Sequence, residues 1–184
     1  YRFAPPAPPV LELDVLRVVN SRLKLKYELN CSDVRLTNSY VDAHELLNIS
    51  TLVVSSSTVN VYAVASVNAM MLQSSTWTNT KQLRPSASLT LQSATLIASS
   101  ELMATNLLSM DASSTLKSSD TSGGSLEVYA EQASLGGQLQ TGTLKLSSLK
   151  LTTAATSTIT APGRLTVVAD EASLLGTASC GTAS

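Results

Sequence analysis

The chain has 184 residues, enough for one domain with a substantial core, and its polarity comes from hydroxyl groups more than from charge. It contains 29 Ser and 21 Thr, whereas charged residues make up only 14% of it, against about 25% in typical soluble proteins. The net charge of −1 gives no basis for a nucleic-acid partner. No apolar run approaches the length of about 20 residues that crosses a bilayer, so we expect no transmembrane segment.

Three regions follow one another along the chain. Residues 1–10 are rich in proline and predict an extended linker that leads into the folded part. Residues 11–176 carry a repeating pattern, and residues 177–184 are expected to form a flexible tail. The chain starts without Met and without a signal-peptide pattern, so we expect a processed product or a piece of a longer protein.

The repeating unit is a pair of apolar residues two positions apart, followed by a small residue or Asn. Apolar alternation with a period of two is typical of a strand. Two further apolar rows follow, 7 and 13 residues after each start, broken only at Thr115, Thr121 and Ser157. Successive starts are 18, 18, 18, 19, 19, 18, 18 and 21 residues apart, at Leu16, Val34, Leu52, Met70, Leu89, Leu108, Leu126, Leu144 and Leu165.

Three inward-facing segments in each unit of about 18 residues predict an all-β fold, a parallel β-solenoid of about nine coils. The small residue after each apolar pair fits a tight corner, where Asn and Ser side chains satisfy backbone groups and their own copies in adjacent coils. We expect turns at residues 81–85, 120–124 and 159–164. The corner positions include Asn20, Asn38, Ser56, Ser74 and Ser93, and continue at Ala112, Ala130, Ser148 and Ala169.

These stacked Asn and Ser positions resemble the ladders of parallel β-helices of the extracellular, adhesin-like type. The resemblance covers residues 11–176 and concerns the architecture, without one family. The left-handed class usually repeats every six residues, and the rows found here fit that spacing poorly. We therefore expect a right-handed coil.

Two cysteines and two glycosylation sequons bear on the compartment. Cys31 and Cys180 should lie about eight coils apart, roughly 38 Å at about 4.8 Å per coil, which is too far for a disulfide between them. Each is either an ordinary thiol or a partner for another chain. Asn30 and Asn48 begin N-glycosylation sequons, which are consistent with secretion.

Groups that could support catalysis are few, and we expect no enzyme, cofactor or metal site. His44 is the single histidine, and no metal-binding motif is present. Glu127 and Lys145 should face each other one coil apart. A polysaccharide-cleaving site would need these charges gathered on one wall, whereas a solvated edge with ion pairs across coils requires no such gathering. The other acidic residues in this region are Glu131, Asp170 and Glu171.

Ice binding is a further alternative, because TWTNT (76–80) and TSTIT (156–160) place Thr at alternate positions. No matching Thr triplets lie between them, so a repeated lattice match is missing. We expect instead a non-catalytic extracellular solenoid that acts as a rigid spacer, adhesive stalk or filament subunit. Its partners would be copies of itself, neighbouring parts of a longer chain, or glycans. The alternatives are a carbohydrate-binding or lyase-like β-helix and an intracellular scaffold that polymerises end to end.

Overall fold

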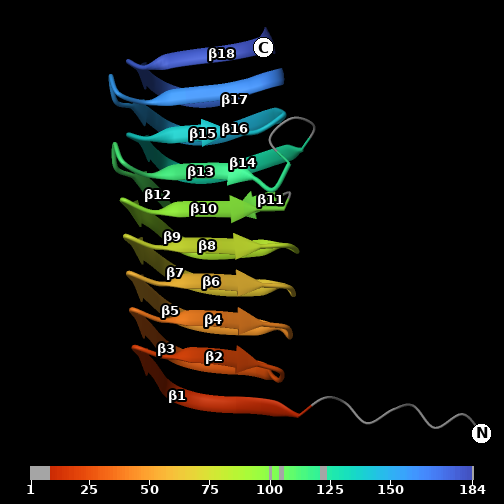
Figure 1. Cartoon of the computed structure of the whole chain (residues 1–184). Helices are drawn as coiled ribbons and strands as arrows, with labels where there is room; N and C mark the ends of the chain where they lie inside the picture. The colour runs from red at the N-terminus through yellow and green to blue at the C-terminus, as the bar shows by residue number, and fades with distance from the viewer. Residues whose placement is uncertain (1–8, 100, 104–105, 121–123, 184) are drawn as a thin grey trace, which may run out of the picture.

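The computed structural model describes residues 9–99, 101–103, 106–120 and 124–183. Most of the Pro-rich linker predicted at residues 1–10 lies outside the described residues. The described residues form parallel strands and no helix (Figure 1). The strands are β1 (Val10–Val19), β2 (Arg22–Leu25), β3 (Glu28–Thr37), β4 (Tyr40–Ala43), β5 (Leu47–Ser55), β6 (Thr58–Val61), β7 (Ala65–Gln73), β8 (Thr76–Asn79), β9 (Leu83–Gln92), β10 (Thr95–Ala98), β11 (Glu101–Met103), β12 (Leu107–Met110), β13 (Thr115–Ser118), β14 (Ser125–Leu135), β15 (Gln138–Gln140), β16 (Thr143–Thr153), β17 (Thr158–Leu174) and β18 (Thr177–Ala183).

The strands stack into the predicted β-solenoid, with the N-terminal coil at one end and the C-terminal coil at the other (Figure 1). Each coil has three faces. A long strand such as β3 bends to form the first face (residues 28–31) and the second face (residues 33–37). The short strands β2, β4, β6, β8, β10, β13 and β15, together with the starts of β17 and β18, form a third side that we call the short face.

Alternation places every second side chain in a single buried core that runs along the axis. The inward row of the short face shows how the coils stack. Trp77 lies between Val59 on one side and Leu96 on the other. The complete row is Leu23, Val41, Val59, Trp77, Leu96, Leu116, Leu139, Ile159 and Ala178.

The structure corrects the predicted stacking in one place. Leu108 pairs with Ala133, 25 residues later, and not with Leu126. Val128 stacks on Leu102 of the first face, so the apolar pairs that begin at residues 126, 144 and 165 belong to that face. Inward pairs of different faces have the same local pattern, so one long coil is enough to exchange them. With this register, Leu116 and not Thr115 continues the short-face row.

Two predicted turns also differ from the structure. Residues 159–164 lie inside β17, where the pairing register only shifts between Ala161 and Arg164. Most of the extra length of this coil lies at residues 154–157, because the offset between paired strands rises from 18 residues at Leu135 and Thr153 to 20 at Gln138 and Thr158. The turn predicted at 81–85 ends early, since β9 already begins at Leu83. The turn predicted at 120–124 lies partly outside the described residues.

The solenoid continues beyond residue 176. Residues 177–183, expected to belong to a tail, form β18, which pairs in parallel with β17. Backbone hydrogen bonding therefore extends the ladder through this segment, although its composition is that of a linker. Within the described ranges, no helix is long and apolar enough to span a bilayer.

Candidate functional site

A corner with left-handed backbone follows the second face in the first five coils. Asn20, Asn38, Ser56, Ser74 and Ser93 have φ angles of 51°, 49°, 49°, 47° and 50°. Asn tolerates this conformation better than most residues. The Nδ2 of Asn38 donates to Oδ1 of Asn20 over 2.8 Å, which joins two coils. The later residues predicted for this row do not continue it, because Ala130, Ser148 and Ala169 lie within strands β14, β16 and β17.

The serine after each of the first four corner residues uses its hydroxyl within the fold. The backbone N–H of Ser39 donates to Oγ of Ser57 over 3.0 Å, and the N–H of Ser57 donates to Oγ of Ser75 over 3.1 Å. The hydroxyl of Ser57 in turn donates to the carbonyl of Ser55 over 2.7 Å. These side chains replace the sheet partners that the corner backbone lacks. The corner hydroxyls are therefore structural.

A polar cluster lies on the short face near the N-terminal end. Asn60 Nδ2 donates to the Tyr40 hydroxyl over 2.8 Å and to Asp42 Oδ1 over 3.0 Å. Arg22 lies 3.8 Å from Asp42 and stacks over the Tyr40 ring, with its Cζ 4.6 Å from the ring centroid. The hydrogen bond from Asn60 is the main cause that lowers the pKa of Asp42, and Tyr40 and Arg22 add to it. Burial raises the pKa of Tyr40.

His44 extends this cluster at the edge of the same face. Its ring stacks on that of Tyr62, with centroids 4.8 Å apart and an interplanar angle of 17°. The sequence analysis identified only His44 here. The signal that it missed is the 18-residue spacing of Arg22, Tyr40 and Thr58, and of Asp42 and Asn60, which places these residues in adjacent coils.

Glu127 and Lys145 form the expected pair across coils, on the first face. Lys145 Nζ lies 3.7 Å from Glu127 Oε2. Tyr129, which the sequence analysis did not identify, joins them. Its hydroxyl donates to Glu127 over 2.6 Å and accepts from Lys145 over 2.8 Å. These hydrogen bonds are the main cause that lowers the pKa of Glu127 and raises that of Lys145. The arrangement is a satisfied ion pair on an open wall.

The other acidic residues of this region lie apart from that pair. Glu131, Asp170 and Glu171 line a shallow cavity of about 280 Å³ together with Lys150. None of the three acids forms an ion pair within the described part of the chain. Across the same ranges, no three His, Cys, Asp or Glu side chains gather closely enough to hold a metal ion.

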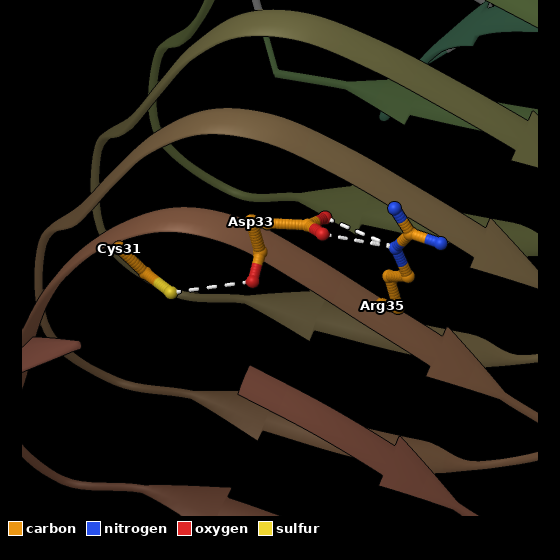
Figure 2. Close-up of polar contacts among 3 residues, drawn as sticks. All are labelled: Cys31, Asp33 and Arg35. Carbon is orange, nitrogen blue, oxygen red and sulfur yellow. Dashed lines mark hydrogen bonds and ion pairs between the residues drawn. The ribbon is translucent and has the colours of Figure 1, made fainter. Parts of the chain in front are cut away.

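Both cysteines are free thiols and lie in different coils. Cys31 is buried on β3, where its Sγ donates to the carbonyl oxygen of Asp33 over 3.4 Å (Figure 2). The Asp33 carboxylate also accepts from Nε of Arg35, over 3.0 and 3.2 Å (Figure 2). Cys180 lies on β18 at the C-terminal end and is half-buried. Access to another molecule therefore favours Cys180.

The two sequon asparagines are stacked partners in adjacent coils on the first face. Asn48 is exposed. Asn30 is half-buried, and its Oδ1 is covered and has no hydrogen-bond partner among the described residues. Adjacent coils are only about 4.8 Å apart, so two glycans on these neighbouring side chains would compete for space. Exposure favours Asn48 as the acceptor.

No family model, curated protein or solved structure matches this chain.

Proposed function

We propose that this chain is a non-catalytic, extracellular β-solenoid that serves as a rigid spacer or adhesive stalk within a larger assembly. The observation that carries the proposal is that the core is uncovered at both ends of the ladder. Leu174 continues the inward row of Thr153, yet its side chain is 59% exposed. At the opposite end, Leu11 pairs with Leu29 and is 38% exposed.

These uncovered coils favour continuation of the ladder. The outer edge of β1 carries backbone groups with no partner strand, because β1 pairs with β3 alone. Such edges accept another strand readily. A further coil of the same polypeptide or of a neighbouring subunit would cover the apolar residues and pair the edge. Stacked coils with few charges then form a rod whose length grows by about 4.8 Å per coil.

The extracellular setting has two supports. The exposed Asn48 begins a sequon, and hydroxyl groups supply most of the surface polarity. An intact mass of the protein from its native source tests this setting. Attached glycan agrees with the proposal, whereas its absence at both Asn30 and Asn48 favours the intracellular alternative.

Sedimentation velocity under reducing and non-reducing conditions tests assembly through the ends. We expect the wild-type chain to form elongated oligomers as its concentration rises. Leu174→Lys should reduce this by at least about tenfold in association constant, because a charge would be buried at the joint.

Leu149→Lys is the matched control, since Leu149 is 57% exposed on the side of the rod and lies away from both ends. It should associate as the wild type does. Circular dichroism confirms that each variant is folded. A wild type that stays monomeric at all concentrations, or equal loss in both variants, would contradict assembly through the ends.

A further inference from the structure

The short face carries a row of Thr side chains that the sequence analysis did not detect. Thr58, Thr76, Thr95 and Thr115 lie in register on four consecutive coils. The row continues through Gln138 to Thr158 and Thr177 on the following three coils. It spans six coil spacings, or about 29 Å at about 4.8 Å each. The corrected register after residue 116 is what brings its two halves into line.

These hydroxyls differ from those at the corners. The corner serines Ser39, Ser57 and Ser75 each donate to the carbonyl two residues earlier. Within the described part of the chain, the hydroxyls of Thr76 and Thr95 make no hydrogen bond, and the same holds for the other five residues of the row. The fold does not use them, so each can act as donor and acceptor toward a ligand.

The surroundings of the row restrict the kind of ligand. From β6 to β18, Lys117 is the one charged side chain that points outward among the described residues of the short face. The parallel second row is otherwise Asn60, Thr78, Ile97, Gln140, Thr160 and Ser179. A polyanion would require a basic face. Ile97, Lys117 and the two glutamines also interrupt the regular double row that an ice lattice requires.

An aromatic group lies at one end of this face. Tyr62 is 43% exposed and is held in place by its stacking on His44. Asp42 and Asn60, on the same face, add carboxylate and amide groups already connected to each other. A flat sheet with repeated neutral hydrogen-bonding groups, ending in an aromatic ring, matches the hydroxyls and apolar ring faces of sugars.

We propose that the short face binds a linear, uncharged polysaccharide that lies along the solenoid axis. The chain crosses the strands, and successive sugars contact the Thr row. This inference rests on the adhesive role proposed above and gives that role a ligand class. Its test uses dilute, monomeric protein, so it can fail while assembly through the ends stands.

The experiment measures retention on insoluble cellulose and chitin and on immobilised mannan, with alginate as the charged comparison. We expect wild-type protein to bind at least one uncharged polymer and to leave alginate unbound. Thr76→Val combined with Thr95→Val removes two hydroxyls and preserves shape and strand propensity. It should weaken binding by about tenfold.

The matched control is Thr51→Val combined with Thr90→Val, two outward Thr residues on the second face. This control should bind as the wild type does. Thr95→Arg, which places a long side chain over the row, is a second variant that should abolish binding. No retention on any uncharged polymer, equal loss in the control, stronger binding to alginate, or adsorption to ice alone would each overturn the proposal.

Discussion

At the scale of single residues, the corner serines show how a small side chain stabilises a tight bend. Ser57 is 5% exposed, and its Oγ accepts from the N–H of Ser39 in the preceding coil. A buried N–H without a partner costs more free energy than one hydrogen bond contributes. Ser at this position therefore connects two coils in addition to filling the corner.

Ser57→Ala should lower the free energy of unfolding by about 1–3 kcal/mol, because it leaves the Ser39 N–H buried and unpaired. Urea denaturation followed by circular dichroism measures the change. Ser66→Ala is the control, since Ser66 points outward from β7 and its side chain makes no hydrogen bond among the described residues. Equal effects of the two substitutions would contradict a structural role for the corner hydroxyl.

At the scale of elements, the core depends on how the inward rows of successive strands pack. Trp77 on β8 is 1% exposed and is the largest of the fully buried side chains. Its Nε1 has no hydrogen-bond partner among the described residues. Its contribution to stability therefore comes from the buried area of the ring and not from a polar contact.

Trp77→Ala should cost about 3–5 kcal/mol of unfolding free energy, because it opens a cavity between the Val59 and Leu96 coils. Trp77→Phe should cost clearly less, since it keeps an aromatic ring and removes the unpaired N–H. Met71→Ala, at a 38% exposed outward position, should stay within about 0.5 kcal/mol of wild type. A Trp77→Ala protein as stable as the Met71 control would show that β8 does not pack as described.

At the scale of the whole molecule, the register across the long coil determines which surfaces exist. The pairing of Lys117 with Gln140 joins the two halves of the short face. If the 18-residue spacing continued instead, Ser109 would lie beside Glu127, and the Thr row would end at Thr115. The structure places Ser109 beside Ser134.

Engineered disulfides can distinguish these registers. With both native cysteines replaced by Ala, Lys117→Cys combined with Gln140→Cys should oxidise readily, because adjacent parallel strands lie about 4.8 Å apart, within the range for a disulfide. Ser109→Cys combined with Glu127→Cys should stay reduced. Non-reducing electrophoresis and mass spectrometry identify the bond. The opposite result would restore the regular 18-residue stacking.

The amino-acid sequence by itself determined the strand period, the repeat of about 18 residues and the positions of the first five corners. Local features carry this information, namely alternating apolar residues and Asn or Ser where the backbone must turn. The same features predicted the Glu127–Lys145 pair, because residues one coil apart are neighbours. They could not show that Tyr129 joins the pair, since its role depends on the side-chain geometry within two coils.

Only the tertiary structure decided which inward pair stacks on which after residue 110. Leu126-Glu127-Val128 and Leu108-Ser109-Met110 have the same local pattern, so sequence spacing cannot assign them to different faces. The assignment depends on the packing of complete coils around the long connection, where a seven-residue shift still keeps apolar side chains inside. The same packing extends the ladder through β18 and aligns the Thr row, because stacking in a solenoid is a property of whole coils.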